Sequence, residues 1–380
     1  MDEIYLDNAA TTAMSPAALQ AMTECMRECF GNPSSLHMAG QRAASRLEEA
    51  RDIIAEAIGA SADEIFFTSG ATESNNLALR GFVLSNGAGN VRLVTQATEH
   101  PSVLNTANYL RQEGIDVTVL PVDENGMIVS EPDEALFSGD GRTVLLSVMH
   151  TNNETGAVFP VEKLAEAARR NGGIYHCDAV QAVGKAPIDA AGTGIDMLSA
   201  SAHKFHGPKG TGFLYVRKGI DLRNVTFGGE QERSLRPGTV NAPAIWAMAV
   251  ALRECVSGME ENSERMRTLK ALLKRSLAEK CPGIHVNAEG APANDCTLSV
   301  SFPGVGADML LYGLDREGLR VSAGSACSAG SLEISHVIKA MGAEKYGAPI
   351  RFSLSRFTTE EEVMRAAETV SSVFGRLTEK

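Results

Sequence analysis

The stretch from residue 91 to residue 216 alternates short apolar runs with helical segments, and this alternation limits the possible fold more than any other feature. The apolar runs have the composition of buried strands and are joined by short, turn-rich connections: VRLVTQ, DVTVLP, TVLLSVM, GIYHCD, DMLSA and GFLYV. Alternating strands and helices build a mainly parallel sheet with helices on its faces. We therefore expect an α/β fold.

The pattern changes near residue 243, where long helices follow one another. The helix expected over residues 260–280 carries one apolar stripe of Met266, Leu269, Leu273 and Leu277. After it come the strand-like run CTLSVSF, a loop of small residues and a final helix. These features predict a smaller α+β unit, with a domain boundary near residues 258–262.

The composition argues against several kinds of partner. The chain has 380 residues, of which 44 % are hydrophobic and 22 % charged, and its formal net charge is −12. This charge opposes binding to nucleic acid and to anionic membrane surfaces, and no basic run offsets it. The first residues, MDEIYLDNAATT, are polar, and no stretch approaches about 18 uninterrupted apolar residues. We expect a cytoplasmic protein without a membrane or nucleic-acid partner.

Seven cysteines without C-x-x-C or Cys/His ligand spacing favour neither a disulfide framework nor a metal site. Cys25 and Cys29 fall with Leu19, Met22 and Met26 on one face of a helix that opens at Ser15 and Pro16. We expect these two thiols to be apolar core fillers.

The segment SASAHKFHGPKGTG, residues 199–212, places Lys204 in a glycine-rich turn between two apolar runs. An unpaired ammonium among buried strands is costly, whereas a lysine that has condensed with an aldehyde is no longer strongly basic. The alternative is an ordinary lysine on a surface loop. The neighbouring strands favour Lys204 as the attachment point of an aldehyde cofactor, pyridoxal phosphate.

Pyridoxal phosphate needs a carboxylate at its pyridine nitrogen, donors at its phosphate and a group stacked on its ring. Asp178 ends a predicted strand and suits the nitrogen, although it could instead cap the next helix. A lone histidine is more often structural, but one that follows a strand can stack on the ring or move protons. The candidates for the phosphate are Ala71, Thr72, Ser201 and His203, and the candidate for the ring is His100.

Cys327 and Arg351 are the residues that we expect to act on the substrate. Cys327 lies among small residues in VSAGSACSAGSLE, where nothing large enough to bury it is present, so we expect an accessible thiol that a modest fall in pKa would make nucleophilic. The alternative is an incidental loop thiol. Arg351 could hold a substrate carboxylate with two hydrogen bonds, although an arginine beside a strand is more often a surface ion-pair partner.

A series of motifs, in order over nearly the whole chain, resembles the pyridoxal-phosphate-dependent cysteine desulfurases of the NifS/IscS type, in the class-V aminotransferase family. These motifs are YLDNAATT, FGNPSS, TSGATESNN, ATEH, NNETG, CDAVQ, SAHKFHGPKGTG, QERSLRPGT, GSACSAGSLE and RFSLSRFTTEEE. The resemblance implies the aspartate aminotransferase fold, which has a large domain with a mixed sheet, a smaller domain built from both chain ends, and a homodimeric assembly. Here it implies a large domain over residues 13–259 and a small one over residues 1–12 and 260–380.

The resemblance also implies a role for each matching residue. Lys204 would bind the cofactor covalently, Asp178 its ring nitrogen and Gln181 its ring oxygen, with His100 on the ring. The implied phosphate contacts are Ala71, Thr72, Ser201, His203 and, from the second subunit, Thr239. Asn153 and Arg351 would lie at the cofactor and the substrate carboxylate, and Cys327 would take the sulfur.

The activity implied is removal of sulfur from L-cysteine, which gives L-alanine and a persulfide on Cys327. The sulfur would pass to an iron–sulfur scaffold or a sulfurtransferase. The sequence ends at Lys380 soon after the last helix, without the tail that some members use to dock such a scaffold, so the acceptor stays open. Two alternatives are a selenocysteine lyase or another pyridoxal-phosphate enzyme of the same fold, and a non-catalytic sulfur-transfer partner.

Overall fold

The computed structural model describes residues 3–129, 134–137, 141–324 and 334–379. Its central feature is a sheet in which, within these residues, seven strands are hydrogen-bonded side by side. All neighbours in the sheet are parallel except β8, which is antiparallel to both strands beside it. The strands, in sheet order, are β2 (Ile65–Thr68), β8 (Gly212–Val216), β7 (Met197–Ser201), β6 (Ile174–Asp178), β5 (Thr143–Ser147), β3 (Val91–Gln96) and β4 (Asp116–Leu120).

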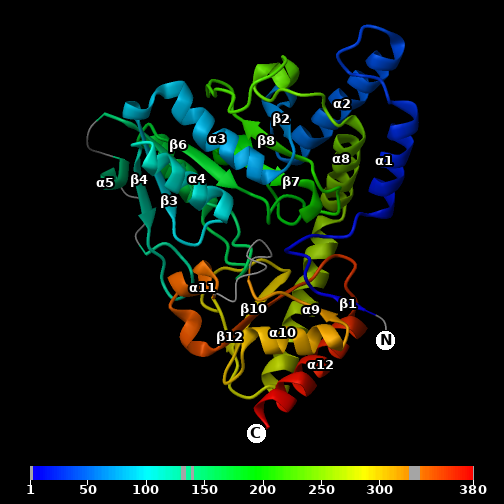
Figure 1. The fold of residues 1–380 in the computed structure, drawn as a ribbon, viewed down its shortest axis with the longest axis vertical. Helices are drawn as coiled ribbons and strands as arrows, with labels where there is room; N and C mark the ends of the chain where they lie inside the picture. Colours follow the sequence, from blue (N-terminus) through cyan, green and yellow to red (C-terminus); the bar gives the residue numbers. More distant parts are fainter. Residues whose placement is uncertain (1–2, 130–133, 138–140, 325–333, 380) are drawn as a thin grey trace.

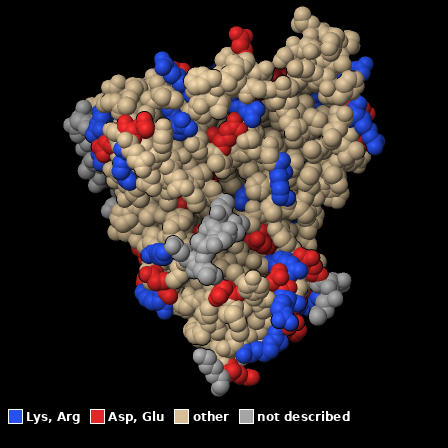
Figure 2. All heavy atoms as spheres, in the orientation of Figure 1, with Lys and Arg blue, Asp and Glu red and all other residues tan. Residues whose placement is uncertain are grey.

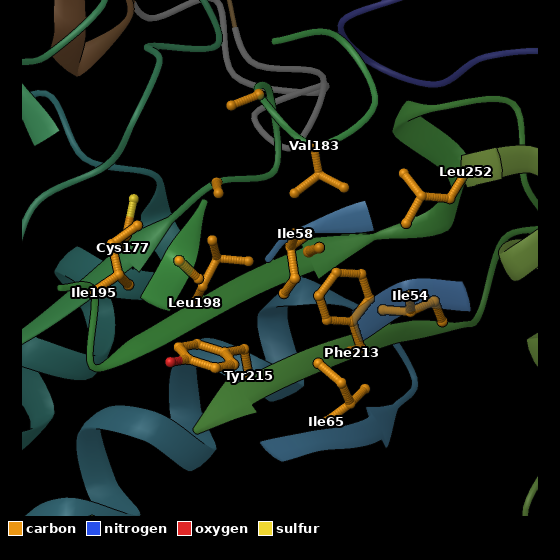
Figure 3. Packing of buried hydrophobic residues seen from close by; sticks show 14 of the residues in the cluster. Ile54, Ile58, Ile65, Cys177, Val183, Ile195, Leu198, Phe213, Tyr215 and Leu252 are labelled. Carbon is orange, nitrogen blue, oxygen red and sulfur yellow. The ribbon is translucent and has the colours of Figure 1, made fainter. Parts of the chain in front are cut away.

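Helices cover both faces of this sheet, because its strands present apolar side chains alternately to each side. On β8, Leu214 and Val216 pack with α3 (Ala71–Asn86) and α4 (Pro101–Gln112). Phe213 and Tyr215 point to the opposite face, where both belong to the apolar cluster of the helices that cover it, and Figure 3 shows Phe213 beside Ile54. Those helices are α2 (Met38–Ala57), α6 (Val161–Arg170) and α8 (Ala242–Ser257), with α1 (Pro16–Glu28) packed outside α8.

A second apolar core belongs to a smaller body that both ends of the chain enter (Figure 1). It is built on a three-stranded antiparallel sheet of β12 (Ala348–Ser353), β10 (Thr297–Phe302) and β9 (His285–Val286), with β1 (Ile4–Tyr5) paired to β11 (Leu319–Arg320) nearby. Its helices are α9 (Met259–Lys280), α10 (Ala307–Arg316), α11 (His336–Ala340) and α12 (Glu360–Thr378). Two short helices, α5 (Glu134–Phe137) and α7 (Ala190–Thr193), belong to the larger body.

We call the two bodies the large unit and the small unit. The predicted α/β fold with a mixed, mainly parallel sheet is confirmed. The exact division into residues 13–259 and residues 1–12 with 260–380 stays a prediction.

Local sequence signals set several element ends. The hydroxyl of Ser15 accepts from the amide of Ala18 and Pro16 opens α1, whereas a capping box of Thr359 and Glu362 starts α12. The sequence predicted a wider apolar face on α1 than the structure buries. Cys25 and Cys29 are buried, but Leu19 and Met26 are 56 % and 58 % exposed, because α1 packs on α8 along a narrow row of small side chains.

On the face drawn in Figure 2, basic and acidic side chains are intermixed over both units, and neither sign forms a large patch. Among the described residues, no helix combines the length and the apolar character that crossing a membrane requires.

Candidate active site

A cavity of about 370 Å³ lies where the parallel strands of the large unit end. Asp178 is the last residue of β6 and Ser201 the last of β7, and the carboxyl ends of parallel strands are where α/β proteins commonly bind ligands. The small unit also lines the cavity, through residues 9–11 and through Arg351 of β12. The predicted site residues that line this cavity are Ala71, Thr72, His100, Asn153, Asp178, Gln181, Ser201, His203, Lys204 and Arg351.

Two predicted site residues do not take part in this grouping. Thr239 is exposed and does not line the cavity of its own chain. Cys327 lies outside the described residues. The parts assigned to both stay predictions.

Lys204 follows β7 directly in a 3-10 turn and points into the cavity wall rather than to a surface loop. Its Nζ donates to the main-chain oxygens of Ala9 at 2.6 Å and Ala10 at 2.9 Å. The amine is thus held at the cavity by the chain's N-terminal segment.

Asp178 is 5 % exposed and accepts a hydrogen bond on each carboxylate oxygen. The amide of Val180 donates to Oδ1 at 3.1 Å, which is the local capping contact expected for an aspartate there. Asn75 of α3 donates through Nδ2 to Oδ2 at 2.8 Å. The carboxylate therefore both starts the turn after β6 and lines the cavity, so the two interpretations of Asp178 are compatible.

His100 is the N-cap of α4, and its Nδ1 accepts from the amide of Ser102 at 3.1 Å. Burial lowers the pKa of this imidazole, although the charge of Asp178 opposes the shift, and Lys204 and His336 lower it further. A neutral ring follows at physiological pH.

The end of the cavity near α3 is built for an anion. Gly70 has φ +145°, a conformation that favours glycine, and a methyl group on it would lie 3.4 Å from Ser201 Oγ. The amides of the first turn of α3, which include those of Ala71 and Thr72, have no acceptor within the helix. Burial and the nearby Lys204, Lys209 and Lys185 lower the pKa of His203 to about 4.

The acidic side chain of Glu73 also lines that part of the cavity, but it is engaged elsewhere. It accepts from Arg236 Nε at 2.8 Å and from the amide of Ser69 at 2.7 Å. Burial alone would raise the pKa of Glu73, but these hydrogen bonds bring it below its usual value. The carboxylate is therefore neutralised by Arg236 instead of repelling an anion in the cavity.

Gln181 is held from two sides. Its Nε2 donates to the main-chain oxygen of Ala9 at 2.9 Å, and its Oε1 accepts from Lys185 Nζ at 2.8 Å. An ammonium can only donate, so this contact sets which end of the amide is oxygen.

Arg351 is buried at the other end of the cavity, with its side chain only 2 % exposed. Its Nη1 donates to the main-chain oxygen of Asn153 at 2.9 Å and its Nη2 to Asp7 Oδ1 at 2.7 Å. Within the described part of the chain, its buried Nε has no hydrogen-bond partner. Arg351 is therefore not the surface ion-pair partner considered above. Its contacts hold the guanidinium in a fixed orientation at the cavity.

Sequence reasoning missed several residues that support the site. Asn75, Ser102 and Lys185 stand inside or next to the quoted motifs but have unremarkable types for their positions. Glu99 is fully buried, and its Oε1 accepts from Gln96 and from the amide of Met149. Burial, with a smaller effect of Asp178, raises the pKa of Glu99 to about 8. A glutamate directly before His100, soon after the strand-like run VRLVTQ, was the available signal.

Comparison with known proteins adds the decisive observation. The family model described as aminotransferase class-V matches residues 4–365. The chain belongs to the class-V aminotransferase family. A cysteine desulfurase of Cereibacter sphaeroides is 44 % identical over 99 % of this chain and 97 % of its own.

Similar solved structures agree with this assignment. A NifS-like protein superposes with a TM-score of 0.91 at 36 % identity, over 98 % of this chain and all of the other. SspA, solved in complex with cysteine, has a TM-score of 0.81 at 33 % identity, over 94 % of this chain and all of SspA. The predicted relationship to cysteine desulfurases of the NifS/IscS type is confirmed, and so is the assignment to an enzyme family.

Proposed function

We propose that this chain is a pyridoxal-phosphate-dependent cysteine desulfurase that converts L-cysteine to L-alanine and leaves the sulfur as a persulfide on Cys327. The observation that carries the proposal is the single cavity around which Lys204, Asp178, His100 and Arg351 converge. The full-length similarity to cysteine desulfurases supports the choice of reaction within the family.

The residues present fit pyridoxal phosphate. The cofactor has an aldehyde, a pyridine nitrogen and a phosphate, and the cavity offers an amine, a carboxylate and an anion-binding helix end. The orphaned first-turn amides beside Gly70 and Ser201 match a phosphate in particular. When bound, the cofactor supplies an electron sink for the carbanion formed at the substrate Cα.

Each side chain then has a defined task. Lys204 Nζ would hold the cofactor, and its amine would take the Cα proton of the substrate. Asp178 would accept from the ring nitrogen and Gln181 would donate to the ring oxygen. His100 would contact the ring and return a proton. Ala71, Thr72, Ser201 and His203 would hold the phosphate together with Thr239 of the partner subunit, so the proposal includes a homodimer.

The substrate is held by Arg351 and Asn153. The guanidinium faces the cavity with a fixed orientation, which suits a carboxylate that accepts two parallel hydrogen bonds. The Cys327 thiolate attacks the substrate sulfur, so an S–S bond forms and the Cβ–S bond breaks. The electron pair stays on Cβ, and alanine leaves once Cβ has gained a proton and Cα has regained the proton that it lost.

Gly324, the described residue before the stretch that carries Cys327, lies beside Glu154 of the large unit. A methyl group on Gly324 would lie 3.2 Å from Ser335 Cβ, so the described residues that flank the stretch are close together.

The persulfide sulfur would pass to an iron–sulfur scaffold or a sulfurtransferase. A cytoplasmic location is part of the proposal, because the six described cysteines are unpaired thiols, as is usual in a reducing compartment.

A substrate panel tests the reaction. Purified protein loaded with cofactor is offered L-cysteine, L-selenocysteine, or an amino acid with a keto acid, and alanine is measured with a thiol reductant present. The proposal expects alanine from L-cysteine, and none after Lys204→Ala, which also removes the yellow band of the lysine-bound cofactor. Alanine from selenocysteine alone, or amino transfer to the keto acid alone, would instead support the alternative enzymes.

A further inference from the structure

Asn75 is a buried amide that no part of the reaction described so far uses. It lies on α3 with no exposed surface, and its Nδ2 is 2.8 Å from Asp178 Oδ2 and 2.8 Å from Ser102 Oγ. Within the described residues its Oδ1 has no hydrogen-bond partner. A buried carbonyl oxygen without a partner costs about 1–3 kcal/mol. The contacts that hold the Asn75 side chain in place are therefore those of Nδ2.

The orientation of this amide follows from the charge it faces. The reverse orientation would place Oδ1 against the carboxylate oxygen of Asp178, where two acceptors repel each other. With Nδ2 towards Asp178, both amide hydrogens are used, one for the carboxylate and one for Ser102. The hydroxyl of Ser102 is consequently an acceptor from Asn75.

The remaining proton of Ser102 decides the state of His100. A hydroxyl has one hydrogen, and the second side chain that contacts this hydroxyl is His100, whose Nδ1 lies 2.7 Å away. Nδ1 also accepts from the amide of Ser102 at 3.1 Å. A nitrogen that accepts from two donors carries no proton of its own, so a neutral ring has its hydrogen on Nε2.

We infer that Asn75 and Ser102 are positioning residues that hold His100 in the Nε2–H tautomer and couple it to the carboxylate of Asp178. Three elements contribute to this chain of hydrogen bonds: α3, the start of α4 and the end of β6. The catalytic consequence rests on the proposed function: in this tautomer, Nε2 is the nitrogen from which His100 would donate a proton. The charged and titratable groups that act on this ring are Asp178, Lys204 and His336.

The direct test is the tautomer itself. Long-range proton–nitrogen NMR spectra of holoenzyme with ¹⁵N-labelled histidine distinguish Nδ1–H from Nε2–H, and His100→Gln identifies the signal. Wild type should show Nε2–H. Ser102→Ala, which removes the hydroxyl donor, and Asn75→Leu, which removes the group that orients it, should shift the Nδ1 resonance. Ser102→Thr, which keeps the hydroxyl, should restore the wild-type signal.

A matched control is Asn86→Leu, the same change at the exposed far end of α3, which should leave the His100 signal unchanged. In the alanine assay, Ser102→Ala should lower kcat by about 10-fold, with the KM for L-cysteine within about twofold of wild type. Nδ1–H in the wild type, or a His100 signal that neither Ser102→Ala nor Asn75→Leu moves, would overturn the inference.

The two proposals fail separately. The histidine spectra are recorded without substrate, so they decide the tautomer even if wild type makes no alanine. If Asn75→Leu does not fold, Ser102→Ala and Ser102→Thr alone decide the outcome.

Discussion

Arg351 of the small unit donates a hydrogen bond to the main-chain oxygen of Asn153 in the large unit, across 2.9 Å. The same guanidinium is paired with Asp7 of the N-terminal segment at 2.7 Å. The proposed carboxylate clamp is therefore formed by three separate parts of the chain, and its geometry depends on how the two units are joined. A lysine could supply the charge at this position but not the planar arrangement of donors.

Arg351→Lys should accordingly weaken substrate binding more than it slows the reaction. We expect the KM for L-cysteine to rise by about 10- to 100-fold, with a smaller change in kcat, since a bidentate contact to the carboxylate is lost. Steady-state kinetics measure both constants. Arg376→Lys, at an exposed ion pair of α12, is the control. An unchanged KM in the Arg351 variant would remove this residue from the substrate site.

Glu99 should make the protein less stable as pH rises. Its pKa is raised from 4.5 to about 8, so the folded state binds a proton that the unfolded state has released, and stability falls between these two values. Glu99→Gln keeps the acceptor for Met149 and Gln96 but cannot ionise. The difference in unfolding free energy, variant minus wild type, should grow by up to about 1.4 kcal/mol per pH unit in this window.

Denaturant unfolding at a series of pH values measures that difference. Glu56→Gln, on the exposed side of α2, should show no such trend. Parallel pH profiles for wild type and Glu99→Gln would mean that Glu99 is ionised in the folded protein.

Lys185 should influence the cofactor through Gln181. Burial lowers the pKa of its ammonium, with Arg351 acting in the same direction, and its Nζ is the group that fixes the Gln181 amide. Lys185→Met removes this donor and leaves the Nε2 contact with Ala9 to hold Gln181, so the amide can shift and weaken its proposed contact with the ring oxygen. We expect a shifted absorption band and a shifted pH titration of that band. Lys274→Met, at a partly exposed ion pair, is the control and should show neither change.

The sequence was most informative where the chemistry demands unusual residues. Lys204 between two buried strands and Asp178 at a strand end could be recognised without a structure, because both are costly there unless used. Asn75 and Ser102 could not, since an asparagine within a helix and a serine in its first turn are common, and only the folded chain brings them to Asp178 and His100. The wide apolar face expected on α1 failed because helical periodicity does not reveal how much of a face its neighbour covers.

The most direct measurement of the central proposal is the intact mass of the cofactor-loaded protein after exposure to L-cysteine, before any reductant is added, in wild type and in Cys327→Ala. The wild type should gain the mass of one sulfur atom and release alanine, and the variant should do neither. Alanine formation at the wild-type rate by Cys327→Ala, or a sulfur adduct on another cysteine, would contradict transfer through Cys327.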